Sequence, residues 1–420
     1  MAESGVVDVL GFDCLAERTL ALAQVKRAAD QEAGYDPRLP EYLRRLAPSL
    51  KRGLTVVGNF GAANVAAATE RTVKELRDAG LGGMRVGSIQ GDDVLDLVRG
   101  DDIEIPDLGK RLSELGDRVV SANAYVGAQP VIDCLEEGAS WVLGGRLADV
   151  SLFVGPICWA LGWPLDDPAQ AAQATMIGHL LECGVQVTGG YFADPPYREV
   201  PGQAHLGFPY AEYRDDEWTI RKSGGSGGLV DERVVKLQLA YEVHDPARYL
   251  TPDVTADFTN VECRDLGDDQ VAVGGARGAP RPETLKVLVG VDLGYRVVAE
   301  IGYAGTGCIA RAGDAEAIIR SAIDGFGEDV TESRFDLVGV DALAGGTRPE
   351  TGEPAELRLR VAAYCRTQKT AEALADEVEY LYLGPAGGGG VTRAISRPIG
   401  IFPASIARDR VDIVTELIDL

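Results

Sequence analysis

The sequence predicts an α/β fold, in which an N-terminal parallel sheet with flanking helices, layered in a Rossmann-like way, is followed by a mixed α+β domain. Short apolar runs alternate with segments of helical spacing over the first half of the chain. From about residue 190 the composition shifts toward Gly, Pro and Tyr. The chain has 420 residues, more than one hydrophobic core ordinarily serves. We therefore expect two domains, residues 1–190 and residues 191–420.

Each apolar run of the first domain is followed by a helical segment. The runs occupy residues 6–12, 54–60, 84–90, 119–125 and 140–145. Short strands that alternate with helices indicate a parallel sheet with helices packed against it. A further helix over residues 171–184, ended by Gly184, closes the domain.

The second domain mixes strands, helices and glycine-rich turns. Its segments are a loop at "SGGSGG" (223–228), a helix or a strand over 233–245, two strands joined by a turn over 284–305, a helix over 315–327, a strand over 355–367, a helix over 369–384, and a turn into a strand from "GPAGGGG" (384–390) onward. This mixture indicates an α+β domain.

Composition and charge exclude several kinds of partner. The net charge of −24, from 65 acidic and 41 basic residues, disfavours binding to nucleic acid or to anionic membranes. Seven cysteines without a C-x-x-C pair argue against a disulfide framework or a zinc knuckle, and they fit a reducing compartment. The first residues lack a signal-peptide pattern, and no apolar run reaches the roughly 18 residues of a membrane helix. We therefore expect a cytoplasmic protein.

Polar residues follow each apolar run of the first domain. In chain order they are Asp13 and Glu17, then Asn59 and Asn64, then Gln90, Asp92 and Asp93, then Asn123 and Tyr125, and finally Arg146 and Asp149. In open α/β sheets, ligands bind beyond the carboxyl ends of the strands. We therefore expect a shared polar crevice at this edge of the sheet.

Each of these residues also has a purely structural interpretation. Asp13, Asp92 and Asp149 fit helix caps as well as they fit ligand contacts. Arg146 fits either an ion pair with Asp149 or a bidentate grip on a carboxylate or phosphate, and we favour the ligand. Asn123, like Asn59, lies within or at the end of an apolar run rather than in a cap position, which favours a functional role.

Two further clusters carry chemistry. His179 and Glu182 lie three residues apart on a predicted helix, which places an imidazole beside a carboxylate for acid–base work or leaves a buried, satisfied histidine. Lys222 precedes the glycine-rich "SGGSGG", a setting that can hold an anion. No G-x-G-x-x-G follows the first strand, so neither a nicotinamide nor a flavin site is indicated.

Long motifs give the chain a family resemblance. The segments "SANAYVGAQPVIDCLEEGASWVLGGRLADVSLFVGP", "GHLLECGVQVTGGYF" and "KLQLAYEVHDPARYLTPDV" resemble the acyclic terpene utilisation family, the AtuA-like proteins, as do "FDCLAERT", "GYDP" and "GPAGGGG". Where the family commonly reads N-x-G-G-x-N-P, this chain has "NFGAANV". Many members also carry a small extra C-terminal domain, which we expect this chain to lack.

The resemblance implies a role in the breakdown of branched acyl-CoA compounds derived from terpenes, or in specialised metabolism. Our leading hypothesis is a hydro-lyase or related lyase that acts on a small carboxylate or acyl thioester. The substrate-binding residues would be Asn59, Asn64, Asn123, Tyr125, Arg146 and Lys222, and the catalytic residues would be His179, Glu182 and Asp149.

Two alternatives stay open. The first is a metal-assisted hydrolase or ligase, in which Asp13, Glu17, Asp92 and Asp93 hold a hard cation such as Mg²⁺. The second is a non-catalytic subunit that binds an acyl ligand within a carboxylase or hydratase assembly. In every case we expect a homo-oligomer, as is common for proteins of this size.

Overall fold

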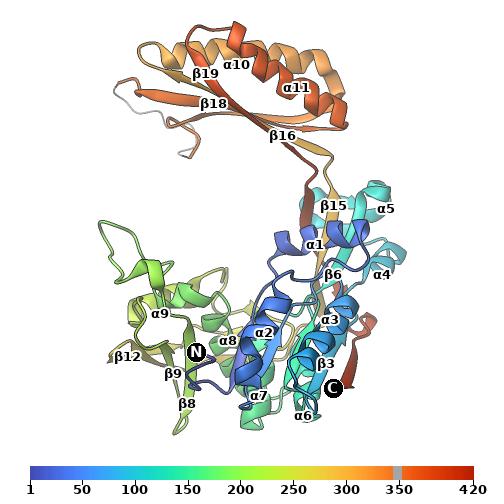
Figure 1. Cartoon of the computed structure of the whole chain (residues 1–420), viewed down its shortest axis with the longest axis vertical. Coiled ribbons are helices and arrows are strands. Elements are labelled where there is room, and N and C mark those ends of the chain that lie inside the picture. The colour runs from blue at the N-terminus through green and yellow to red at the C-terminus, as the bar shows by residue number, and fades with distance from the viewer. Residues whose placement is uncertain (344–351) are drawn as a thin grey trace. The chain divides into compact units, whose positions relative to one another are not determined.

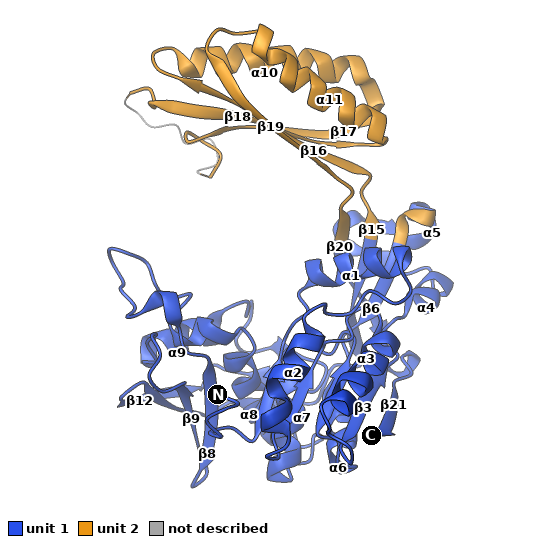
Figure 2. Cartoon of the chain, viewed as in Figure 1, with its two compact units in different colours: residues 1–116, 120–290, 401–420 blue, residues 117–119, 291–400 orange. Residues whose placement is uncertain are grey.

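The computed structural model describes residues 1–343 and 352–420, which form two compact units (Figures 1 and 2). Unit 1 comprises residues 1–116, 120–290 and 401–420, and unit 2 comprises residues 117–119 and 291–400. The predicted boundary at residue 190 falls inside unit 1, because Ile177 of the helix before it shares an apolar cluster with Ile220 and Val271 after it. Among the described residues, no helix combines the length and apolar character needed to cross a bilayer.

Unit 1 is built on a five-stranded sheet. Its strands, in spatial order, are β1 (Val9–Phe12), β2 (Thr55–Gly58), β7 (Trp141–Gly144), β3 (Arg85–Gln90) and β21 (Val414–Asp419). The first four strands run parallel, which confirms the predicted parallel sheet, and β21 pairs with β3 in the antiparallel direction.

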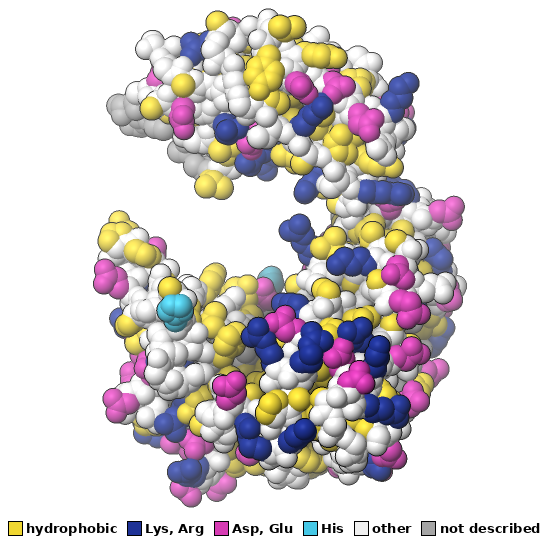
Figure 3. Space-filling model, in the orientation of Figure 1, with side chains coloured by type: hydrophobic (Ala, Val, Ile, Leu, Met, Phe, Trp, Pro, Cys, Tyr) yellow, Lys and Arg dark blue, Asp and Glu magenta, His cyan; other side chains and the backbone are white. Residues whose placement is uncertain are grey.

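On the face shown in Figure 3, basic side chains lie among acidic ones despite the net charge of −24.

One predicted member of this sheet lies elsewhere. The strand β6 (Val119–Ala124) belongs to a three-stranded sheet with β15 (Thr284–Asp292) and β20 (Ile399–Ala407). The backbone NH of Tyr125 donates to the carbonyl of Lys286, so β6 is committed to β15 rather than to the parallel sheet. The chain passes into unit 2 through β15 and returns through β20.

Helices cover both faces of the parallel sheet. They are α2 (Leu39–Leu50) and α3 (Val65–Asp78) on one face, and α6 (Gln129–Glu136) and α7 (Ser151–Leu161) on the other. The other helices in this part of the chain are α1 (Glu17–Ala29), α4 (Leu95–Gly100) and α5 (Leu112–Leu115). The neighbours Val56 and Val57 on β2 show the two-sided burial, because Val56 packs with α2 and α3 while Val57 packs with α6 and α7. Both side chains are fully buried, as expected for a strand covered on both faces.

The rest of unit 1 packs around the helix α8 (Pro168–Leu181), whose small side chains allow close approach. A four-stranded antiparallel sheet contains β12 (Glu262–Gly267), β13 (Gln270–Gly274), β9 (Glu217–Lys222) and β8 (Pro209–Arg214). The shorter strands are β4 (Glu104–Ile105) with β5 (Lys110–Arg111), and β10 (Tyr249–Leu250), β11 (Thr255–Asp257) and β14 (Arg277–Ala279). The segment 233–245, left open between helix and strand, forms α9 (Glu232–Ala240) and a turn.

Unit 2 has a ferredoxin-like topology. Its elements in chain order are β16 (Tyr295–Ala304), α10 (Cys308–Phe326), β17 (Val330–Val338), β18 (Glu356–Cys365), α11 (Gln368–Tyr380) and β19 (Gly388–Ser396). The strand order β17-β18-β16-β19, antiparallel throughout, is that of a β-α-β-β-α-β unit. Alternate residues of β16 and β18, such as Ile301 and Leu359, are buried with Ile319 of α10 and Leu374 of α11. The mixed α+β character predicted for residues 191–420 is confirmed, although these residues are divided between unit 1 and unit 2.

Candidate functional site

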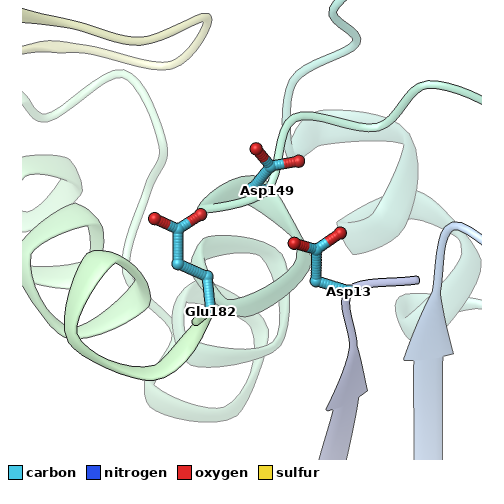
Figure 4. Close-up of side chains that lie close together, drawn as sticks. All are labelled: Asp13, Asp149 and Glu182. Atoms are coloured by element: carbon cyan, nitrogen blue, oxygen red, sulfur yellow. The ribbon is translucent and has the colours of Figure 1, made fainter. Parts of the chain in front are cut away.

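Three carboxylates meet at the carboxyl edge of the parallel sheet. Asp13 follows β1, Asp149 lies between β7 and α7, and Glu182 directly follows α8. One oxygen atom of each lies within 4.8 Å of the others, and Figure 4 shows the three side chains close together. We call Asp13, Asp149 and Glu182 the carboxylate cluster. Asp13 is exposed, the Asp149 side chain is 33% exposed and that of Glu182 is 9% exposed.

Asn59, at the end of β2, holds Asp13 in place. Its amide nitrogen donates to Oδ1 of Asp13 at 2.7 Å, and its oxygen accepts from the backbone NH of Cys14 at 2.7 Å. Asn59 is fully buried, whereas Asp13 is exposed. Its amide group therefore binds the loop after β1 and orients the carboxylate of Asp13.

Arg146 links the cluster to the surrounding loops. Its side chain is 1% exposed, and Nη2 lies 2.8 Å from Oδ1 of Asp149. Nη1 donates to the carbonyl of Leu15 at 2.7 Å, and the guanidinium lies 4.0 Å from the centre of the Tyr125 ring. The ion pair with Asp149, which was one of the two interpretations of Arg146, is therefore present. Enclosed in this way, Arg146 orients Asp149 and the loop that carries Asp13.

His179 lies behind Glu182. Its side chain is 1% exposed and packs against the rings of Tyr249 and Phe258, with centroids 5.3 and 6.0 Å away. Nδ1 lies 3.3 Å from Oε1 of Glu182, and neither ring nitrogen has a hydrogen-bond partner of good geometry among the described residues. The predicted pairing of His179 with Glu182 across one helical turn is thus found.

The crowding of negative charge shows in the pKa values of the cluster. Burial raises the pKa of Asp149 to about 7, because the opposing charge of Arg146 is offset by the carboxylates of Asp13 and Glu182. Burial also raises the pKa of Glu182, although contact with His179 opposes the shift. Three carboxylates share one guanidinium, so the cluster favours the arrival of positive charge, either a proton or a cation.

A second polar group adjoins Arg146 on its Tyr125 side. The Tyr125 hydroxyl donates to Oε1 of Glu17 at 3.4 Å, and Nζ of Lys286 lies 3.0 Å from the same oxygen. Lys286 also lies 4.8 Å from the centre of the Tyr125 ring and is 47% exposed. Lys286, in the middle of a predicted strand, gave no signal of a site in the sequence, because only the fold brings β15 to this place.

The remaining residues predicted to hold a metal do not join the cluster in the described structure. Asp92 is buried, and its Oδ2 accepts from the backbone NH of Arg146 and from Asn123, both at 2.9 Å. Oδ1 of Asn123 in turn accepts from Gln24 at 3.0 Å. Asp93 pairs with Arg27 at 3.4 Å. The structure thus groups Asp13 with Asp149 and Glu182, and not with Glu17, Asp92 and Asp93.

Two further residues predicted to bind substrate, Asn64 and Lys222, make contacts within the protein. Asn64 is the N-cap of α3, accepts from the backbone NH of Ala67 at 3.2 Å, and donates to the carbonyls of Gln31 and Ala33. Lys222 ends β9 and lies 3.0 Å from Asp269. In the part of the chain that the structure describes, neither contacts the carboxylate cluster.

A cavity of about 580 Å³ lies elsewhere in unit 1. Gln129, Trp163, Asp253 and Arg281 are among its lining residues. Asp253 uses both its oxygens inside the protein, accepting from Ser151 Oγ and from the backbone NH of Ala128. We place the functional site at the carboxylate cluster, because buried polar groups with unmet hydrogen bonds gather there and not at this cavity.

The parallel sheet with polar side chains gathered beyond its strands defines an α/β protein whose candidate ligand site is at the carboxyl edge. The chain belongs to the family described as acyclic terpene utilisation family protein AtuA, whose model matches residues 1–417. The resemblance inferred from the motifs is therefore confirmed. No curated protein matches the chain, and no solved structure does.

Proposed function

We propose that this protein is an enzyme of acyclic terpene breakdown that adds water to, or removes water from, a small carboxylic acid or acyl thioester. The observation that carries the proposal is the convergence of three carboxylates, from three separate chain segments, on one small volume at the strand ends. The family to which the chain belongs is named for acyclic terpene utilisation, which supports a role in terpene breakdown.

The geometry divides the work of such a reaction between two neighbouring groups. Hydration places the oxygen of water on one carbon of a double bond and a proton on the other. The carboxylate cluster accepts hydrogen bonds, so it can hold and orient the water, and Glu182 or Asp149 is placed to take up its proton. Because His179 is enclosed, we assign it the role of positioning Glu182 rather than of touching substrate.

The anionic end of the substrate would bind on the other side of Arg146. Arg146 itself is enclosed, whereas Lys286 is about half exposed and lies beside the Tyr125 hydroxyl. An ammonium and a phenol together can hold a carboxylate or polarise a thioester carbonyl. We therefore assign Lys286, which the sequence did not single out, the anion-binding role that was expected of Arg146.

The test is a mass-spectrometric assay with a panel of enoyl- and hydroxyacyl-CoA thioesters and their free acids. We expect gain or loss of water in at least one panel member, and loss of that turnover in Asp13→Asn and Lys286→Met. The matched control is Asp324→Asn, an exposed carboxylate on α10 in unit 2. Turnover that survives Asp13→Asn would move the reaction away from this site, and no turnover at all would favour a binding subunit.

A further inference from the structure

We propose that the carboxylate cluster binds one divalent cation that prefers oxygen ligands, such as Mg²⁺ or Mn²⁺, with Asp13, Asp149 and Glu182 as its ligands. The inference deepens the proposed function and rests on it only for the role of the cation in turnover. With the cation bound, the reacting water becomes a cation ligand, and the carboxylates hold the cation rather than the water. A bound cation makes such water a stronger nucleophile by lowering its pKa.

The spacing of the carboxylates fits one cation. Hard cations bind oxygen at about 2.0 to 2.6 Å, so two ligands on opposite sides of the ion lie roughly 4 to 5 Å apart. One oxygen from each of Asp13, Asp149 and Glu182 lies within 4.8 Å of the other two. Figure 4 shows these three side chains lying close together.

His179 gives a second, independent indication of a ligand. Its side chain is 1% exposed, and neither ring nitrogen has a hydrogen-bond partner of good geometry among the described residues, although Nδ1 lies 3.3 Å from Oε1 of Glu182. Leaving a buried imidazole unsatisfied is costly. Imidazoles and carboxylates that sit behind metal ligands commonly orient them by hydrogen bonding. His179 fits this positioning role, because a small shift of Glu182 toward a cation would let Nδ1–H donate to the bound carboxylate.

The charge balance of the cluster also favours a divalent ion. The ionised cluster has three negative charges, and Arg146 supplies one positive charge. A divalent cation would neutralise the two charges that remain. Arg146 contacts only one oxygen of Asp149, whose side chain keeps a third of its surface exposed, and Asp13 is open to solvent. The cation therefore has both a free ligand face and a path of entry.

Direct binding of the metal alone tests the inference without a substrate. The full chain, stripped with a chelator and dialysed, would be titrated with MnCl₂ and with MgCl₂ by calorimetry, and Mn²⁺ binding would be followed by electron paramagnetic resonance. We expect one Mn²⁺ per chain, and an affinity at least about tenfold weaker in Asp13→Asn and in Glu182→Gln, whereas Asp324→Asn binds as the unaltered chain does. Loss of the positioning contact in His179→Gln should weaken Mn²⁺ binding by about 10- to 100-fold.

The outcomes separate this inference from the proposed function. Absence of stoichiometric binding, or binding that Asp13→Asn leaves unchanged, would overturn the cation site. Asp13 is exposed, so this variant is expected to fold, and its tryptophan fluorescence would verify that. Mn²⁺ binding without turnover of any acyl substrate would keep the cation site and refute the hydration proposal. Turnover by metal-free protein would keep the hydration proposal and refute the role of the cation in turnover.

Discussion

Replacing Arg146 by methionine tests whether this side chain holds the site together. The guanidinium is 1% exposed, pairs with Asp149 at 2.8 Å and donates to the carbonyl of Leu15 at 2.7 Å. Removing one partner of a buried ion pair costs about 3–5 kcal/mol, and losing a charged hydrogen bond costs about 1.5–3 kcal/mol. The two losses overlap, and water can solvate Asp149 because a third of its side chain is exposed, which reduces the cost. We therefore expect Arg146→Met to lower the free energy of unfolding by about 3 kcal/mol.

Tryptophan fluorescence during urea unfolding reads this effect in unit 1 alone. The four tryptophans are Trp141, Trp159, Trp163 and Trp218, and all of them lie in unit 1. The control is Arg264→Met, which breaks an ion pair with Glu217. Both of these side chains are about half exposed, so the change should lower the free energy of unfolding by less than about 1 kcal/mol. If Arg146→Met costs no more than Arg264→Met, the enclosed ion pair is not structural, and Arg146 regains the ligand-binding role favoured from the sequence.

Three other changes have definite expected outcomes. Burial opposes the ionisation of Asp36, but hydrogen bonds from Arg38 outweigh this effect and lower the pKa of Asp36 in the folded protein. The ionised Asp36 therefore stabilises the fold fully above its ordinary pKa of 3.8, and this stabilisation is lost as the pH falls through the lower pKa of the folded state. Asp36→Asn should therefore lower the melting temperature at neutral pH and flatten its fall below pH 4, and an equally steep fall would contradict this. Lys222→Met removes the ion pair with Asp269 and should destabilise unit 1 without changing Mn²⁺ affinity or turnover, which a direct substrate contact would change. Leu359→Ala should cost unit 2 about 2–5 kcal/mol, seen as a shifted calorimetric transition while the tryptophan midpoint stays in place.

Local patterns in the sequence determine much of the fold. The alternation of apolar runs and helical segments predicts β1, β2, β3 and β7 in a parallel sheet, and this is confirmed. The run around Val56 and Val57 is apolar at consecutive positions, which is typical of a strand buried on both faces. The contact of His179 with Glu182 was also predictable, because residues three apart on a helix are neighbours.

The pairing of strands that are far apart in the chain could not be predicted from these local patterns. The strand β6 has the apolar pattern of its neighbours, yet it pairs with β15, more than 150 residues away in the chain. The fifth place in the parallel sheet is taken by β21 from the C-terminal end. Neither pairing can be predicted from local periodicity, since both depend on which chain segments the rest of the fold brings together. For the same reason the sequence did not group Asp13 with Glu182.

The polar residues singled out from the sequence divide by whether the fold satisfies them. Asp92 accepts two hydrogen bonds, and Asn64 and Lys222 are tied to backbone or to a partner charge, so the fold alone accounts for them. Glu182 and His179 are different. Both side chains are almost fully buried, neither ring nitrogen of His179 has a hydrogen-bond partner of good geometry among the described residues, and Glu182 lies beside further negative charge. Buried polar groups without partners lower stability, and natural proteins keep them mainly at functional sites. A cation that completes the coordination of these groups would repay that cost, so we expect Mn²⁺ to raise the urea midpoint of unit 1 and Asp13→Asn to abolish the increase.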